Sequence, residues 1–184
     1  MKKEEKKTLA FIGLGSNLGN CRKNVLDAWA SLGELTGVTL LALSSPYQTE
    51  PVGMISENWF INAVGSIETN LAPEQLLAAM HGIEADLGRR RVKDSPLPED
   101  RPLDLDLLFW GDRISDDPAL TLPHPQIHQR LFVLAPMAEI GPNHKHPLIG
   151  KTMLELLDIL QSEQGGSPQV TKTTWFDNTM EQAN

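Results

Sequence analysis

The hydrophobic periodicity of this chain changes in a regular order, and this order restricts the folds that the chain can adopt. Alternating or short continuous apolar segments predict strands, whereas apolar residues three or four positions apart predict helices. From the N-terminus the order is strand, helix, strand, strand, helix, strand, over residues 8–16, 21–35, 38–49, 59–69, 72–88 and 102–111. This βαββαβ order predicts an α+β fold of the ferredoxin-like type, in which an antiparallel sheet carries two helices on one face.

The C-terminal part of the chain extends this core. It predicts two helices and an edge strand, within residues 126–141, 152–163 and 169–176. No internal repeat or domain-sized linker divides the sequence, and 184 residues are enough for one hydrophobic core. We therefore expect a single domain over residues 8–176, with a charged flexible tail at 1–7 and a frayed tail at 177–184.

The composition argues against two classes of partner. The formal net charge of −8 does not favour nucleic acid, and no apolar run approaches the ~20 residues that a membrane helix needs. The first residues lack the apolar region and cleavage site of a signal peptide. Cys21 is the only cysteine, which suits a reducing compartment. We expect a cytoplasmic protein that binds neither nucleic acid nor a membrane.

The last strand of the predicted core, RPLDLDLLFWG, contains two acids in a strongly strand-like segment. Since successive side chains of a strand point to opposite faces, one face should be apolar and pack on the helices, with Leu103, Leu105, Leu107 and Phe109. Asp104 and Asp106 share the other face, with β-carbons roughly 7 Å apart. Two ionised carboxylates this close repel each other, and Mg²⁺ between them removes the penalty. The alternative is a solvated acidic face, the commoner origin of an isolated D-x-D pair.

A basic cluster precedes these acids. Arg89, Arg91 and Arg101 lie on the connection between the second predicted helix and the strand of Asp104 and Asp106. On an acidic protein, such a local cluster suits a small polyanion such as the phosphates of a nucleotide. Carboxylates that hold Mg²⁺ beside arginines that hold phosphate oxygens predict phosphoryl transfer, and a solvated surface loop is the alternative.

Six segments follow one another in a recognisable order: FIGLGSNLGN, SSPYQTEPVG, FINAV, IEADLGRRR, DRPLDLDLLFWGD and LTLPHPQIHQRLFVLAPMAEIGP. Over residues 8–160 the chain resembles the 6-hydroxymethyl-7,8-dihydropterin pyrophosphokinases of the folate pathway. The resemblance implies transfer of the terminal pyrophosphate of ATP to the hydroxymethyl group of the pterin, with release of AMP. It also implies two Mg²⁺ ions on the triphosphate and the same ferredoxin-like fold.

The resemblance assigns roles to individual residues. The catalytic residues would be Arg89, Arg91, Arg101, Asp104 and Asp106, with the two aspartates as metal ligands. Residues expected to contact ATP are Arg89, Arg91, Arg101, His124, Arg130, His81 and Glu84. Residues expected to contact the pterin are Thr49, Pro51, Val52, Phe60, Asn62 and Phe132, with the two phenyl rings stacked on the heterocycle. The segment GLGSNLGN is expected to end the first strand in a tight turn, with Asn17 behind the site.

The chain departs from the family pattern in the segment VKDSPLPEDR. It lacks the usual Trp, Asp100 stands where Pro is typical, and elsewhere Phe60 replaces the usual Tyr. These changes leave open a non-catalytic relative that binds pterin or nucleotide, or a different pterin alcohol as substrate. A nucleotidyltransferase is a weaker alternative, because its Gly-Ser turn and D-x-D strand are adjacent, whereas Ser16 and Asp104 are far apart here. We expect a monomer or weak dimer, and contact with a neighbouring pathway enzyme stays open.

Overall fold

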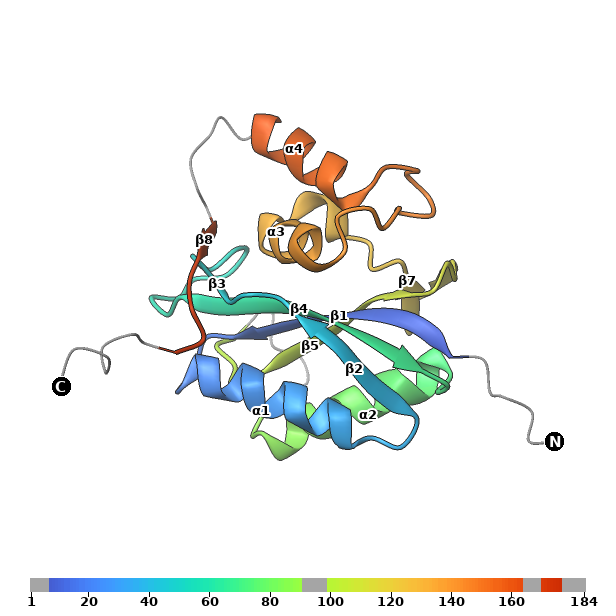
Figure 1. Ribbon diagram of the computed structural model, residues 1–184. Coiled ribbons are helices and arrows are strands. Elements are labelled where there is room, and N and C mark those ends of the chain that lie inside the picture. The colour runs from blue at the N-terminus through green and yellow to red at the C-terminus, as the bar shows by residue number, and fades with distance from the viewer. Residues whose placement is uncertain (1–6, 91–98, 164–169, 177–184) are drawn as a thin grey trace, which may run out of the picture.

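The computed structural model describes residues 7–90, 99–163 and 170–176 (Figure 1). Eight strands lie within these residues: β1 Thr8–Ser16, β2 Val38–Leu43, β3 Tyr47–Thr49, β4 Phe60–Thr69, β5 Asp104–Trp110, β6 Ser115–Asp117, β7 Leu120–Leu122 and β8 Val170–Lys172. The helices are α1 Cys21–Glu34, α2 Pro73–Asp86, the short 3-10 helix η1 Ile127–Gln129, α3 Leu131–Ile140 and α4 Met153–Glu163. Of the predicted tails, all but Lys7 lie outside the described residues.

The main sheet has the strand order β5-β1-β4-β3-β8, and β2 also pairs with β4. Every pairing is antiparallel, and β1 lies between β4 and β5. This order confirms the predicted ferredoxin-like core, in which each helix connects two strands that are separated by a third. The three residues of β8 form an edge strand on β3, as the sequence predicted.

The prediction of one continuous strand over residues 38–49 is wrong, because the segment divides into β2 and β3. The Ser44 hydroxyl accepts a hydrogen bond from the Val64 N–H at 3.0 Å, which replaces a backbone carbonyl in the ladder. The Ser44 carbonyl accepts from Trp175 Nε1 instead, at 3.1 Å. Pro46, which has no N–H, follows, so regular pairing resumes only at Tyr47.

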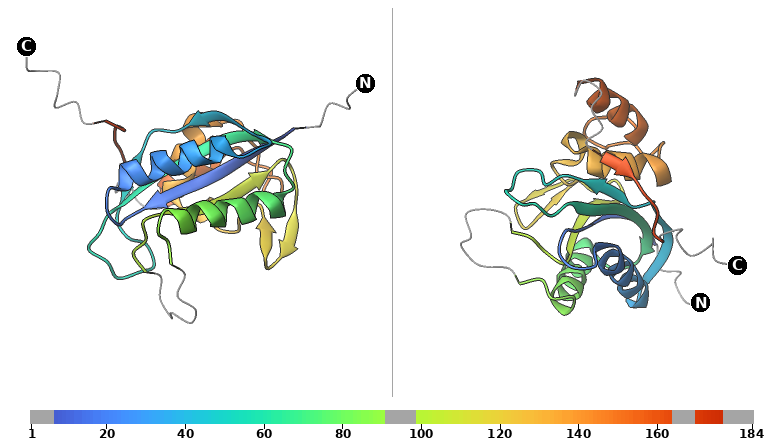
Figure 2. Two further views of the ribbon diagram at one scale, coloured as in Figure 1. Left: turned by 90° about the horizontal axis from the view of Figure 1, so that it is seen from below. Right: turned by 90° about the vertical axis from the view of Figure 1, so that its left-hand side faces the viewer.

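Helices cover both faces of the sheet (Figures 1 and 2). The helices α1 and α2 lie side by side on one face, and α3 and α4 lie over the other. The first interface buries apolar side chains of β1, β4 and β5, among them Ile12, Ile67 and Leu105, against side chains of the two helices such as Leu76. The second buries Val64 and Leu108 with residues of α3 and α4. The two predicted helices on one face are confirmed, and the C-terminal helices close the opposite face.

A β-bulge in β5 corrects one prediction about the apolar face. Ile12 pairs with Leu107, but Phe11 pairs with Phe109, so Leu108 is an additional residue in the ladder. Because of this shift, Phe109 packs in the cluster under α3 and α4, not with Leu107 against α1 and α2. The bulge follows Asp106 and leaves the alternation of the two aspartates unchanged.

The segment after β5 differs from the expected pattern in two further ways. The sequence did not predict the hairpin of β6 and β7, whose three-residue strands are too short for a clear periodicity. The expected helix over 126–141 begins only at Leu131, after η1. None of the helices within the described residues has the length and apolar character that crossing a membrane requires.

Candidate active site

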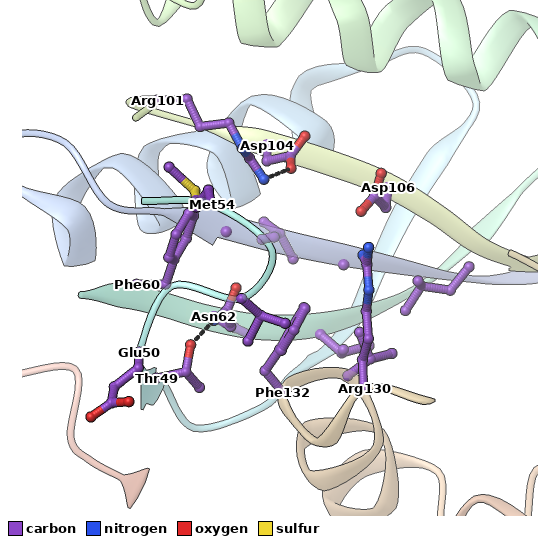
Figure 3. Close-up of a pocket in the computed structure, with 18 residues that line it drawn as sticks. Thr49, Glu50, Met54, Phe60, Asn62, Arg101, Asp104, Asp106, Arg130 and Phe132 are labelled. Atoms are coloured by element: carbon purple, nitrogen blue, oxygen red, sulfur yellow. Dashed lines mark hydrogen bonds and ion pairs between the residues drawn. The ribbon is translucent and has the colours of Figure 1, made fainter. Parts of the chain in front are cut away.

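The candidate site lies on the sheet face that points toward α3, and the strand register assembles it. Gly15 of β1 pairs with Asp104 of β5 on one side and with Asn62 of β4 on the other. Two residues away, Gly13 pairs with Asp106. Since residues i and i+2 of a strand share a face, these side chains are brought together by period-2 alternation. Figure 3 shows Asn62, Asp104 and Asp106 around the same space.

The two glycines of β1 leave room for this space. A β-carbon added at Gly15 would lie 2.9 Å from Asn62 Oδ1, which is too close for an ordinary contact. At Gly13 it would lie 3.6 Å from Leu108, an ordinary contact. The segment GLGSNLGN ends β1 as expected: Gly13 and Gly15 lie in the last part of the strand, and the turn over residues 17–20 contains Gly19 with a positive φ of 75°. The missed signal was G-x-G in a strand, which places two residues without side chains on the same face.

The first of two neighbouring hollows is the aromatic cavity, defined by Phe60 and Phe132. Its lining residues are Gly13, Leu14, Gly15, Thr49, Glu50, Val52, Met54, Phe60, Asn62, Ala63, Val64, Arg101, Asp104, Asp106, Leu108, Arg130, Phe132 and Val133. Asn62 is buried, and its Nδ2 donates a hydrogen bond to Thr49 Oγ1 at 2.9 Å. That bond fixes the amide, with Oδ1 on the side of Gly15. The cavity therefore offers two aromatic rings and an oriented amide.

The second hollow is the polar cavity, on the side of β5 toward α2. Its lining residues are Leu77, His81, Arg89, Arg101, Asp104, Leu105, Asp106, Leu107, Pro118, Ala119, Leu120, Thr121, His124, Pro125 and Arg130. The His124 N–H donates to the Leu108 carbonyl at 3.0 Å, and His124 Nδ1 accepts from the Gln126 N–H at 3.3 Å. In the neutral ring, Nε2 then carries the proton and can donate to a ligand. Burial lowers the pKa of His124 despite the nearby Asp106 charge, which favours this neutral form.

Four residues line both cavities: Arg101, Asp104, Asp106 and Arg130. The two carboxylates and two guanidinium groups thus stand where the aromatic cavity meets the polar cavity. A group bound among aromatic rings and a phosphate chain bound among cations would come together at these four side chains. This junction is the place where a transfer between two ligands can occur.

Asp104 is neutralised by two arginines. Arg101 Nη2 lies 2.6 Å from Asp104 Oδ2, and Arg89 donates to Asp104 Oδ1. Burial acts to raise the pKa of Asp104, but the charges of Arg101 and Arg89 outweigh it and hold this pKa below its ordinary value. Asp104 is therefore ionised at neutral pH.

Asp106 is in the opposite situation. Within the described residues, no arginine or lysine forms an ion pair with Asp106, and its carboxyl is partly buried. Burial and the charge of Asp104 raise the pKa of Asp106, and His124 and Arg130 offset this only in part. A partly buried carboxylate without a direct counter-charge fits a site that is completed by a cation. In the described ranges no cluster of three or more acidic, His or Cys side chains could hold a metal ion by itself.

Arg101 connects the features of the junction. Its guanidinium carbon lies 5.3 Å from the centre of the Phe60 ring, while Nη2 reaches Asp104. Its Nε is buried and has no hydrogen-bond partner among the described residues. Arg130 stands similarly over Phe132, at 5.4 Å. Each guanidinium therefore stacks on one of the two rings of the aromatic cavity.

The model of the family described as 7,8-dihydro-6-hydroxymethylpterin-pyrophosphokinase (HPPK) matches residues 11–142, most of the chain.

The chain belongs to the HPPK family.

Named relatives agree with this assignment. The 2-amino-4-hydroxy-6-hydroxymethyldihydropteridine pyrophosphokinase of Synechocystis is 39% identical over 150 residues, which are 81% of this chain and 74% of the relative. The enzyme of the same name from Bacillus subtilis is 41% identical over 133 residues, or 72% of this chain and 77% of the relative. The folic acid synthesis protein fol1 of Pneumocystis carinii is 39% identical over 140 residues, 76% of this chain but only 18% of fol1.

The fold also matches solved structures. The crystal structure of Plasmodium falciparum HPPK-DHPS has a TM-score of 0.72 and 14% sequence identity, over 93% of this chain and 48% of that chain. At this identity the likeness concerns the fold. This HPPK chain spans about half of that protein and less than a fifth of fol1.

The structure places most of the predicted HPPK site residues at the two cavities. The predicted residues that line the aromatic cavity are Thr49, Val52, Phe60, Asn62 and Phe132. Those that line the polar cavity are His81, Arg89 and His124, and the four shared residues lie between the two cavities. Pro51 is not among the described residues that line the aromatic cavity. Arg91 and most of the divergent loop lie outside the described residues. Glu50 and Met54 line the aromatic cavity but were not predicted, because an irregular loop has no periodicity that would reveal them.

Glu84 lies behind the polar cavity and is not among its described lining residues. It is buried, with 1% exposure, and forms an ion pair with Arg89. The same Oε1 accepts a hydrogen bond from the Leu105 N–H at 2.8 Å. These contacts give Glu84 a positioning role, because they hold Arg89 beside the first residues of β5.

Proposed function

We propose that this chain transfers the pyrophosphoryl group of ATP to the hydroxymethyl group of 6-hydroxymethyl-7,8-dihydropterin. The hydroxyl oxygen forms a bond to the β-phosphorus, and the bond from that phosphorus to the oxygen shared with the α-phosphate breaks. AMP leaves with that oxygen, and the hydroxyl proton passes to solvent. The observation that carries this proposal is the junction of the aromatic and polar cavities at Arg101, Asp104, Asp106 and Arg130.

The pterin is assigned to the aromatic cavity. A flat heterocycle binds well between aromatic faces, and Phe60 and Phe132 are positioned on the walls of this cavity (Figure 3). The Asn62 amide can bond to the polar edge of the ring, and its orientation is fixed by Thr49. The hydroxymethyl group then points toward Asp104 and Asp106, the only carboxylates that both cavities share among the described residues.

ATP is assigned to the polar cavity. Arg89, Arg101 and Arg130 supply three guanidinium groups for phosphate oxygens, and His124 adds an Nε2–H donor. In the structure Arg89 and Arg101 are oriented by the Asp104 carboxylate. Because they are held before ATP arrives, less side-chain freedom is lost on binding. Arg91 stays a sequence-based prediction for this site.

Asp104 and Asp106 would hold Mg²⁺ together with the phosphates. Bound there, Mg²⁺ would neutralise the charge on the phosphates and make the β-phosphorus more open to attack. The protein's own contribution is to fix the two carboxylates on one strand face, with Glu84 bonded to the backbone between them. The two-ion requirement, the cytoplasmic location, the monomeric or weakly dimeric state and any contact with a neighbouring pathway enzyme stay predictions.

Nucleotide product analysis tests the proposal. Purified protein is mixed with ATP, Mg²⁺ and 6-hydroxymethyl-7,8-dihydropterin, and AMP is resolved from ADP by chromatography. We expect one AMP for each pterin consumed, and none when the pterin is omitted. Release of ADP would contradict pyrophosphoryl transfer. Binding of both ligands without AMP would favour the non-catalytic relative.

A further inference from the structure

The loop over residues 50–59, between β3 and β4, forms part of the wall of the aromatic cavity. Glu50, Val52 and Met54 of this loop line the cavity. None of the ten loop residues is buried, and Ile55 is 95% exposed. Core packing therefore does not fix this wall, and polar contacts must decide where it lies.

Among the described residues, the side-chain hydrogen bond that joins this loop to another segment ends on Asp100. Asn58 Nδ2 donates to Asp100 Oδ2 at 2.5 Å. Hydrogen bonding from Ser56, and then from Asn58 and Asn17, lowers the pKa of Asp100 against the opposing effect of burial. The carboxylate is therefore ionised at neutral pH, and its hydrogen bonds are charge-assisted.

The same carboxylate is also bonded to the end of β1. Asn17 Nδ2 donates to Asp100 Oδ1 at 2.6 Å, while Asn17 Oδ1 accepts from the Arg101 N–H at 2.8 Å. A further backbone bond joins the Asn17 N–H to the Arg101 carbonyl at 3.2 Å. Asn17 and Asn58 are 83 and 42 residues from Asp100 in sequence, so this is a tertiary connection and not a local turn motif.

These contacts join three segments at one carboxylate: the end of β1, the wall of the aromatic cavity and the residue before Arg101. We propose that Asp100 is a positioning residue that fixes the 50–59 loop against Arg101 and so sets the affinity for the ligand of the aromatic cavity. The proposal rests on the proposed function, in which that ligand is the pterin. The family pattern, in which Pro is typical at this position, assigns no role to Asp100. The positioning role follows from its hydrogen bonds to Asn17 and Asn58.

Asp100→Ala tests the proposal, with Glu99→Ala as the matched control. Glu99 is the adjacent acid and its side chain is exposed, so its removal changes the net charge equally without touching Asn17 or Asn58. We expect Asp100→Ala to raise the KM for the pterin roughly tenfold, the scale of a lost charge-assisted hydrogen bond. The KM for ATP should stay within about twofold, since Asp104 still orients the Arg101 guanidinium.

Two further variants distinguish positioning from general destabilisation. Asn58→Ala should reproduce the pterin effect, and combining it with Asp100→Ala should add little, because Asp100→Ala already removes the bond that Asn58 makes. Asp100→Asn should restore most of the affinity, since an amide flip of Asn58 lets the new side chain bond to both Asn17 and Asn58. A loss in Asp100→Asn or Glu99→Ala equal to that in Asp100→Ala, or a parallel fall in thermal midpoint, would overturn the proposal.

The loop position itself can be measured without turnover. In protein labelled with ¹³C at the methionine methyl groups, the Met54 signal reports on the loop, and the buried Met80 and Met137 serve as internal references. We expect Asp100→Ala to shift and narrow the Met54 signal, and Glu99→Ala to leave it in place. An unchanged Met54 signal, or a moved signal with an unchanged pterin KM, would refute the positioning role. If the wild type makes no AMP, the proposed function fails, and the pterin dissociation constant replaces KM in the same comparison.

Discussion

Gly15 lies directly opposite Asp104 across the β1–β5 ladder, and Asn62 lies opposite the same glycine across the β1–β4 ladder. One residue without a side chain thus separates the proposed metal carboxylate from the amide of the aromatic cavity. The separation is needed because a β-carbon at Gly15 would come within 2.9 Å of Asn62 Oδ1. The sheet register therefore brings the two proposed substrate sites into contact.

Gly15→Ala should weaken pterin binding more than ATP binding. The added methyl group displaces the Asn62 amide, which then loses its orientation relative to Thr49. We expect the KM for the pterin to rise roughly tenfold, the effect of one misplaced hydrogen bond. Gly82→Ala on α2 is the control, because a β-carbon there meets nothing within 4 Å. Normal pterin affinity in Gly15→Ala would contradict the proposed role of Asn62 in pterin binding.

Asp106→Asn should nearly abolish turnover. The partly buried carboxylate has no ion-pair partner among the described residues, so its charge is available for Mg²⁺. We expect kcat to fall by roughly 10³-fold, and more Mg²⁺ to be needed for the half-maximal rate. Removal of Mg²⁺ with EDTA should stop the wild-type reaction until excess Mg²⁺ is added. Asp116 is an exposed acid on β6, so the control variant Asp116→Asn should behave as the wild type. A near-normal rate for Asp106→Asn would exclude Asp106 as a metal ligand.

Phe132→Ala should weaken pterin binding and leave ATP binding nearly intact. The ring lines the aromatic cavity but not the polar cavity, and it supports the Arg130 guanidinium at 5.4 Å. Loss of one stacking face should raise the dissociation constant of the pterin roughly tenfold, measured by calorimetry. Phe176→Ala removes a ring that is 74% exposed and outside both cavities, and should change nothing. A larger effect of Phe132→Ala on ATP than on the pterin would reverse the assignment of the two cavities.

Glu139 should make the stability depend on pH in the acid range. On α3, its carboxylate accepts from the Ser45 N–H at 3.0 Å and from the Tyr47 hydroxyl at 2.8 Å, and Lys172 Nζ lies 3.3 Å away. Partial burial acts to raise the pKa of Glu139, but these contacts outweigh it and hold this pKa below its ordinary value. Since the folded pKa is depressed, the unfolded chain binds the proton first as pH falls. The stabilisation is therefore complete above about pH 5 and is lost as pH falls through the folded pKa.

Glu139→Gln isolates this contribution. The amide still accepts one hydrogen bond but loses its charge, so the free energy of unfolding at pH 7 should fall by about 1 kcal/mol. Denaturant titrations between about pH 3 and pH 7 should show the wild type and the variant converging at acid pH. A constant difference across this range would exclude Glu139 as the titrating group.

The period-2 pattern was sufficient to predict which residues share the site face. Asp104 and Asp106 were grouped correctly because the side chains of a regular strand alternate. Phe109 was placed on the wrong face, because the bulge at Leu108 depends on pairing with β1 and leaves no mark in the spacing of apolar residues.

Contacts between distant segments could not be predicted in this way. The pairing of Gly15 with Asp104, and the bonds of Asp100 to Asn17 and Asn58, depend on register and loop conformation. Glu84 was assigned to the nucleotide, but its carboxylate is turned to the Leu105 N–H and Arg89. The hydrophobic periodicity of a helix does not show whether an acid such as Glu84 faces the protein interior, because this depends on the groups of other segments that its carboxylate contacts.

A crystal structure with the pterin and a non-hydrolysable ATP analogue bound together with Mg²⁺ would test the proposed function most directly. We expect the pterin ring between Phe60 and Phe132 in the aromatic cavity, and the phosphates in the polar cavity. The hydroxymethyl oxygen should face the β-phosphorus beside Asp104 and Asp106. A pterin bound in the polar cavity, or phosphates remote from the two aspartates, would contradict it.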